Sequence, residues 1–158
     1  MLSITTPGKA SLASLAFAAT AALPFTAQAT TTEARSERGA EMIRHLNNGE
    51  AQPNLEAMRE EFPFLAEATE AYALGDVWGR GVLDDRTRQL TAVAAMAAMG
   101  ETGIMRVHAG YALNVGVSEE ELKEVIYMIT VPAGFPRAIA ASQVLSELFA
   151  EHRSSAAE

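Results

Sequence analysis

The chain has 158 residues and a formal net charge of −8; apolar residues make up 49% of it, but aromatic residues only 6%. The negative charge argues against a nucleic-acid-binding protein, because phosphates require a basic surface. The sequence contains no cysteine, which excludes disulfides, thiolate zinc sites and thiol-based redox chemistry. Its three histidines lie far apart in the sequence, so no ligand-spaced cluster predicts a metal site.

Residues 1–29 have the three features of a secretory signal in the right order. Lys9 is their only charge, residues 12–25 form a weakly apolar run, and Ala27-Gln28-Ala29 fits a small-x-small cleavage site. The run is shorter than the roughly 20 apolar residues that span a bilayer. We therefore expect a periplasmic or secreted protein of residues 30–158 with no membrane span after cleavage. The alternative reading is a disordered, alanine-rich tail.

The first half of the remaining chain predicts a series of short helices. Residues 30–50 form one, ended by Asn47-Asn48-Gly49, and residues 53–62 suggest one or two turns more. A longer helix follows from Phe62 to Trp78, and Gly79-Arg80-Gly81 links it to the next element.

Residues 84–116 predict a central pair of helices. Asp84 and Asp85 suit a helix start, and Gly100 suits a left-handed stop between the two helices. On the second helix an apolar stripe recurs at helical spacing, and the only histidine in the middle of the chain lies on it. The residues of this stripe are Ile104, Val107, His108, Tyr111 and Val115.

Two more helices complete the prediction. Ser118 and Glu121 have the spacing of a capping box at the start of the first. Pro132 is expected to end it, and Pro136 suits the first turn of the last helix, whose tail from His152 should fray. No alternating pattern calls for a strand. The sequence therefore predicts an all-α domain of about six helices.

Several of these stretches, taken in order, resemble the carboxymuconolactone decarboxylase family, which also contains the alkyl hydroperoxidase D-like proteins. The resemblance extends over about residues 62–151, in matching order and spacing. It implies an all-helical bundle that assembles into homotrimers or homohexamers. The stretches that carry it are Gly75-Asp76-Val77-Trp78, residues 83–88, His108, residues 112–116, residues 120–126 and Ala133-Gly134-Phe135-Pro136.

The resemblance also implies which positions carry chemistry. The peroxidase branch has two cysteines, a histidine and a glutamate; aligned on His108, these cysteines become Glu101 and Ile104, and the glutamate becomes Gln89. A thiolate nucleophile requires sulfur, so peroxidase activity is excluded. The decarboxylase branch needs neither cysteine nor cofactor. The resemblance to this branch implies a glutamate where this chain has Gln89. Glutamine can form hydrogen bonds to a substrate but cannot exchange a proton.

Removing CO₂ from a carboxylated lactone leaves a dienolate-like charge that must be delocalised and then protonated. We expect His108 to supply the proton, because an unperturbed histidine titrates near neutrality. Arg86, Arg88 and Arg106 are candidates for holding carboxylates of a small acidic substrate. An apolar wall at the site is expected from Trp78, Tyr111 and Phe135, and a further catalytic carboxylate from Glu101.

Each assignment has a structural alternative. His108 could be a buried histidine bonded to a carbonyl, and Arg86 and Arg88 could pair with Asp84 and Asp85. Arg106 could face a subunit boundary and Trp78 could belong to a core or interface, while Glu101 could be a first-turn charge favoured by the helix dipole. Two functions follow: a cofactor-independent lyase acting on a small carboxylated lactone or related acid, or a non-enzymatic, acid-binding member that kept the fold without the catalytic pair.

Overall fold

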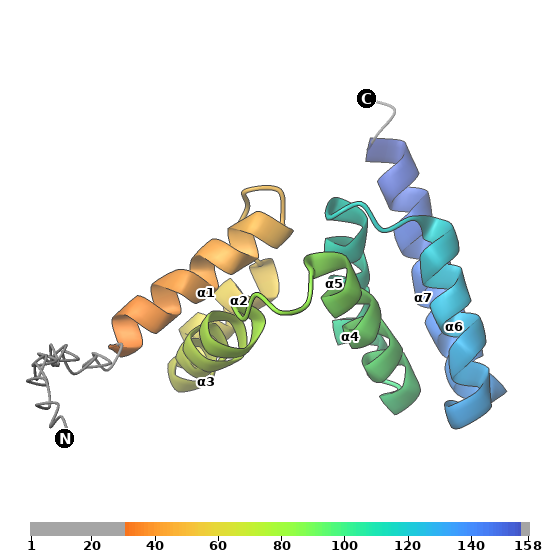
Figure 1. Ribbon diagram of the computed structural model, residues 1–158, viewed down its shortest axis with the longest axis horizontal. Coiled ribbons are helices and arrows are strands. Elements are labelled where there is room, and N and C mark those ends of the chain that lie inside the picture. The colour runs from red at the N-terminus through yellow and green to blue at the C-terminus, as the bar shows by residue number, and fades with distance from the viewer. Residues whose placement is uncertain (1–30, 156–158) are drawn as a thin grey trace, which may run out of the picture.

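The protein is all-α over residues 31–155, the part of the chain that the computed structural model describes (Figure 1). The expected signal segment, residues 1–29, lies outside these residues. The prediction of an all-α domain is confirmed. The described chain contains seven α-helices and one π-helix, η1: α1 (Thr32–Leu46), α2 (Pro53–Glu61), α3 (Pro63–Ala68), η1 (Thr69–Trp78), α4 (Asp85–Met99), α5 (Thr102–Asn114), α6 (Glu119–Ala133) and α7 (Phe135–Ser155).

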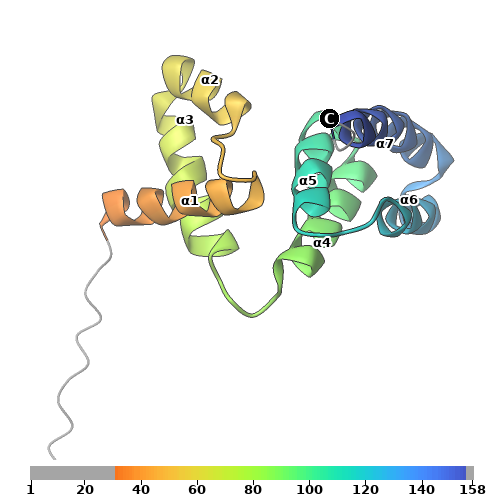
Figure 2. The same ribbon diagram turned by 90° about the horizontal axis from the view of Figure 1, so that it is seen from above.

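The helices form two groups that are joined by residues 79–84. Helices α1, α2, α3 and η1 make an N-terminal lobe, and α4 to α7 make a four-helix body; both views separate the two (Figures 1 and 2). No helix within residues 31–155 combines the length and the apolar character needed to cross a membrane. Because the linker is short, the end of η1 lies beside the start of α4, where the lobe meets the body.

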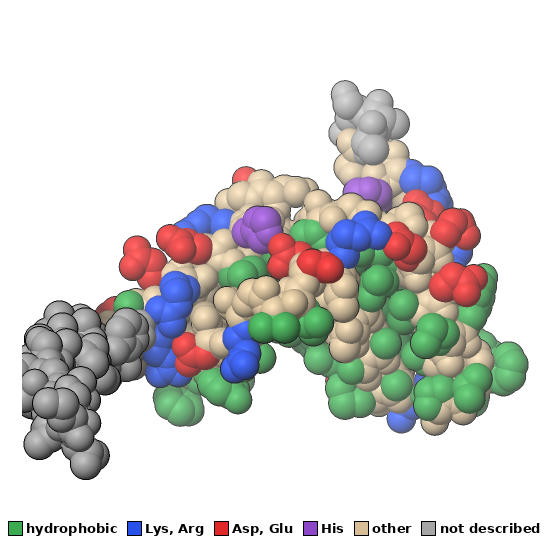
Figure 3. Space-filling model, in the orientation of Figure 1, with side chains coloured by type: hydrophobic (Ala, Val, Ile, Leu, Met, Phe, Trp, Pro, Cys, Tyr) green, Lys and Arg blue, Asp and Glu red, His purple; other side chains and the backbone are tan. Residues whose placement is uncertain are grey.

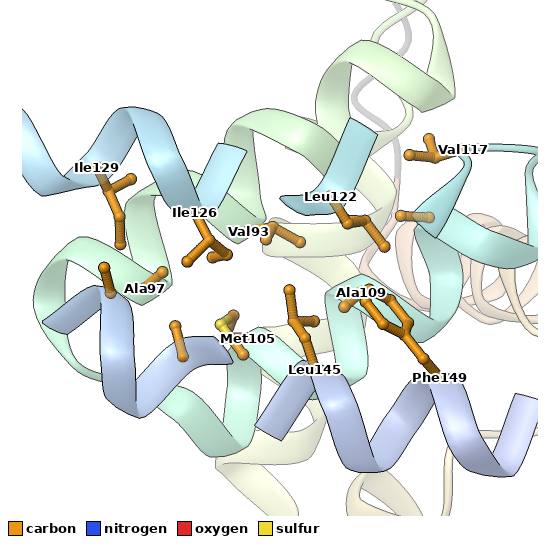
Figure 4. Packing of buried hydrophobic residues seen from close by; sticks show 13 residues of the cluster. Val93, Ala97, Met105, Ala109, Val117, Leu122, Ile126, Ile129, Leu145 and Phe149 are labelled. Carbon is orange, nitrogen blue, oxygen red and sulfur yellow. The ribbon is translucent and has the colours of Figure 1, made fainter. Parts of the chain in front are cut away.

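The four-helix body contains the main apolar core (Figure 4). Met105 of α5, Leu122 of α6 and Leu145 of α7 are almost completely buried within it. Their packing fixes the position of α5 against α4 and α7 and therefore holds the central histidine in place. A smaller cluster around Ile43, Leu55 and Ala66 stabilises the N-terminal lobe.

Most helix ends lie where the sequence predicts them. Asp84 accepts a hydrogen bond from the Thr87 N–H, Gly100 adopts a left-handed conformation (φ 84°), and Ser118 forms a reciprocal capping box with Glu121. Two ends differ. α6 continues one residue past Pro132, whose fixed φ is compatible with a last helical turn. α7 continues to Ser155 instead of fraying from His152, and its last turns are held by an ion pair between Arg153 and Glu119.

The predicted helix 62–78 is not one continuous α-helix. Phe62 separates α2 from α3, and the chain winds as a π-helix from Thr69. At the end of η1 the Gly79 N–H donates to the Leu74 carbonyl, five residues back, at 2.9 Å. Single π-turns are often found at functional sites. Here η1 ends on Trp78, which is directed toward the body.

Helices α1 and η1 cross at two glycines that allow unusually close backbone contact. A Cβ atom added at Gly39 would lie 2.1 Å from the Glu70 carbonyl oxygen, and one at Gly75 would lie 2.2 Å from the Arg35 carbonyl oxygen. No side chain fits at either distance without separation of the helices. The lobe therefore depends on glycine at both positions.

We expect Gly75→Ala to lower the free energy of unfolding by about 1–3 kcal/mol, because the added methyl group overpacks the α1–η1 crossing. The matched control is Gly103→Ala in α5, where nothing lies within 4 Å of an added Cβ. That change should stabilise the protein slightly through helix propensity. Urea denaturation of both variants checks the prediction, and equal stabilities would contradict it.

Candidate functional site

The centre of the candidate site is a hydrogen bond between neighbouring helices. His108 Nδ1 on α5 lies 2.9 Å from Gln89 Oε1 on α4, and the Gln89 side chain is 0% exposed. The two helices form a hairpin around Gly100, which brings these residues, nineteen apart in the sequence, together. The sequence-predicted pair is therefore in direct contact.

This contact determines where the histidine proton lies. An amide oxygen only accepts hydrogen bonds, so His108 donates from Nδ1–H to Gln89 Oε1. In the neutral ring, Nε2 is then left with a lone pair, and it is the nitrogen that can take up or release a proton. The Gln89 amide nitrogen is buried and has no hydrogen-bond partner within residues 31–155.

Two aromatic side chains surround the His108 ring. The Trp78 ring stacks on it with centroids 5.2 Å apart and an interplanar angle of 26°. Tyr111 meets it edge-on, with a centroid distance of 6.1 Å and an angle of 87°. These contacts fix the plane of the imidazole and cover one face of it with the apolar indole ring.

Tyr111 is a buried support of the His108 ring and not an exposed apolar surface. It is only 5% exposed, and its hydroxyl accepts a hydrogen bond from Gln52 Nε2 at 2.9 Å. Burial raises the pKa of the Tyr111 hydroxyl, while the bond from Gln52 lowers it by less. No sequence pattern indicates Gln52, because it precedes Tyr111 by 59 positions and reaches it only through the fold.

Burial also lowers the pKa of His108 below its ordinary value, because a charged imidazolium loses hydration in this setting. Gln89 is neutral, so it supplies no countercharge to the ring. The histidine is consequently neutral at pH 7, and its imidazolium form is a stronger acid than free histidine.

The same shift predicts how stability depends on pH. The unfolded chain binds a proton at His108 near pH 6.5, whereas the folded chain does so only at lower pH. The stability contributed by the neutral ring is complete above about pH 6.5 and is lost as the pH falls through the folded pKa. Denaturation between about pH 7 and about pH 5 should show a smaller loss for His108→Gln than for wild type. Equal losses of stability in the two proteins would contradict a lowered pKa of His108.

Two of the three arginines expected to bind carboxylate, Arg86 and Arg88, are already engaged by the protein. Arg86 donates to the Gly116 carbonyl and forms an ion pair with Glu121 at 2.6 Å. Arg88 donates to the carbonyls of Leu83, at 3.0 Å, and Val77, at 3.2 Å. Neither was found in the predicted pairing with Asp84 or Asp85, and neither contacts His108. Arg88 instead ties α4 to the end of η1 and so helps to position Trp78.

Two other predicted residues lie away from the histidine. Glu101 is exposed at the start of α5, seven residues before His108, which is about 10 Å along a helix axis. Phe135 is 69% exposed at the start of α7 and makes no ring contact with His108. Ile104 of the predicted apolar stripe is 49% exposed, whereas the neighbouring Met105 is buried in the core.

The site therefore consists of Trp78, Gln89 and His108, supported by Tyr111 and Gln52. Within residues 31–155, no three side chains of the metal-ligating types gather in a group that could hold a metal ion. The imidazole of His108 has a fixed orientation and lies beneath the indole ring of Trp78. This arrangement is suited to transferring a single proton to or from a bound molecule.

Sequence comparison with known proteins identifies the family of this chain. The sequence pattern of the Carboxymuconolactone decarboxylase family matches residues 63–147. A 4-carboxymuconolactone decarboxylase from Acinetobacter baylyi is 37% identical over 78 residues, which are 49% of this chain and 58% of that relative. The chain thus spans little more than half the length of this relative. Because the family pattern covers more than half of the chain, including Trp78, Gln89 and His108, the protein belongs to the carboxymuconolactone decarboxylase family.

Proposed function

We propose that this protein is an exported, cofactor-independent carboxy-lyase that acts on a small carboxylated lactone or a related acid. The observation that carries the proposal is the buried Gln89–His108 hydrogen bond under Trp78. The family membership and the decarboxylase from Acinetobacter baylyi support the same class of reaction. From the expected signal segment we propose that this activity lies in the periplasm or outside the cell.

The reaction replaces a carbon–carboxylate bond with a carbon–hydrogen bond. The electrons of the broken bond pass into the conjugated lactone, CO₂ leaves, and the resulting dienolate takes up one proton. The protein must therefore hold the substrate and deliver that proton to carbon. His108 Nε2 is the group that is free to do so, because Nδ1 is bonded to Gln89. In the neutral ring Nε2 has only a lone pair, so it first takes up a proton from solvent, and the imidazolium then gives this proton to carbon.

The neighbouring residues orient this proton and keep the site dry. Gln89 selects the ring nitrogen that faces the substrate, and Trp78 and Tyr111 fix the ring plane. A low-dielectric environment favours loss of charge from the departing carboxylate and makes the imidazolium a stronger acid. Arg88 acts indirectly, through the main chain before and after Trp78. The contacts of Arg86 and Arg88 give no support to a carboxylate-binding role.

The alternative function is a non-enzymatic, acid-binding protein. Gln89 is the observation that favours it, because an amide cannot share a proton with histidine as a carboxylate would. The two functions are separated by incubating the purified protein with 4-carboxymuconolactone and measuring CO₂. Turnover supports the lyase. Stabilisation against heat by the acid, without turnover, supports the alternative.

We further propose that the protein assembles as a homotrimer or homohexamer. An apolar groove of about 590 Å³ lies between Ala94, Ala95 and Ala98 of α4 and Met128 and Val131 of α6. Val131 is 89% exposed, and apolar side chains gather over this end of the body in Figure 3. Exposed apolar patches of this kind mark association surfaces.

Light scattering of the mature protein should therefore give the mass of a trimer or hexamer, and Val131→Glu should shift it toward smaller species because a charge would be buried. Val82→Glu is the matched control, since Val82 is equally exposed but lies on the linker. A wild-type monomer at micromolar concentration, or equal effects of both substitutions, would contradict the proposal.

A further inference from the structure

A second cavity, of about 530 Å³, lies between the start of α2, one face of α5 and the end of α7. On α5 it is lined by Gly103, Arg106, Val107, Gly110 and Asn114, whose spacing of three and four residues defines one side of the helix. His108 lies on another side and does not line the cavity. The side chain between the two sites is Tyr111, which borders this cavity and meets the histidine edge-on.

The cavity contains one incompletely paired arginine. Arg106 Nη2 donates to Glu151, but Nη1 is buried and has no hydrogen-bond partner within residues 31–155. The Glu151 side chain is 64% exposed and the Arg106 side chain 33%, so the carboxylate end of this ion pair is solvated while the guanidinium end is partly buried. A solvated carboxylate gains little from such a pair, and Glu151 can be displaced at small cost.

A carboxylate from a ligand would satisfy Arg106 better than Glu151 does. Guanidinium binds carboxylate most strongly through two parallel N–H···O bonds, and here one of the two nitrogens is unused. Beside Arg106 the lining offers apolar contact from Val107 and Leu148 and a side-chain amide from Asn54. Arg106 is the only arginine of the lining, which contains no lysine, and a single guanidinium matches a monoanion.

We propose that this cavity binds a small organic acid whose carboxylate displaces Glu151 and takes both terminal nitrogens of Arg106, while its apolar body lies against Val107 and Leu148. The site is distinct from His108, so it does not depend on the proposed lyase activity. Glu151 then acts as an internal competitor that occupies Arg106 until the acid arrives.

Phenylacetate, with its neutral isostere phenylacetamide, tests this by NMR titration and calorimetry of residues 30–158. Phenylacetate should bind saturably and shift the Gly103 and Gly110 amides most. Arg106→Gln should weaken binding about tenfold or more, because a charge-assisted pair is lost. Glu151→Gln should strengthen it about two- to fivefold by removing the competitor. Arg137→Gln, which removes a positive charge from the other end of α7, outside the lining of the cavity, is the control and should leave binding unchanged.

Four outcomes would overturn the proposal: no saturable binding at millimolar concentration, equal affinity for phenylacetamide, equal binding by Arg106→Gln, or weaker binding by Glu151→Gln. Largest shifts at His108 and Gln89 would also overturn it, since they would place the acid at the other site. Thermal melting shows whether Arg106→Gln is folded. If Arg106→Gln does not fold, the affinity of Glu151→Gln decides between the outcomes. This substitution is at a solvent-exposed side chain, and it should strengthen the binding of phenylacetate.

Discussion

Replacing His108 with glutamine is expected to lower decarboxylation by about 10²–10⁴-fold, the usual contribution of a positioned acid or base. Glutamine keeps a hydrogen bond to Gln89 within reach but has no group that titrates near neutrality. The loss should appear in kcat, because the proton is needed in the transition state more than in substrate binding. Steady-state kinetics with 4-carboxymuconolactone measures it.

Two controls make this result specific. Thermal unfolding of His108→Gln should stay within about 1–2 kcal/mol of wild type, the size of a lost aromatic pair. His45→Gln removes another histidine, one that pairs with Asp85 at 2.8 Å on the exposed side of the lobe, and should keep full turnover. A His108→Gln protein that loses activity only in proportion to folded protein would show that the histidine is structural.

The second large effect concerns position 89. A glutamate there would accept the Nδ1–H bond with a negative charge, favour the imidazolium and raise the pKa of His108. If the imidazolium donates the proton, wild-type turnover is highest at low pH and declines as the pH rises through the lowered pKa of His108. In Gln89→Glu this decline should move to higher pH, so turnover at pH 7 should rise about tenfold or more.

The pH profile of kcat and an NMR titration of His108 test this shift together. Gln143→Glu adds the same charge on the exposed surface of α7 and should leave both curves in place. Curves for Gln89→Glu that coincide with wild type, or that move to lower pH, would rule out His108 as an acid controlled through position 89.

Local chemistry explains why much of the fold could be predicted. Asp84, Gly100 and the Ser118–Glu121 pair bond or shape the backbone within a few residues of themselves. The helix ends that they set can therefore be predicted from the sequence. The resemblance marked both Gln89 and His108 as site residues, whereas the hydrogen bond between them became apparent only in the structure.

Other features depend on contacts between distant segments and could not be predicted. The π-helical winding before Trp78 occurs where η1 crosses α1 closely at Gly39 and Gly75, a contact that no short pattern encodes. Arg88 matched an anion-binding residue by type, yet it donates to the main-chain carbonyls of Val77 at the end of η1 and Leu83 in the linker.

We propose that a cysteine-free site built on His108 removes CO₂ from a carboxylated lactone. The most direct test is to incubate purified residues 30–158 with 4-carboxymuconolactone, without added cofactor, and to quantify CO₂ and the decarboxylated lactone. We predict equal molar amounts of both products, formed by wild type and nearly absent with His108→Gln. Folded wild-type protein that releases no CO₂, or equal rates for the two proteins, would contradict the account.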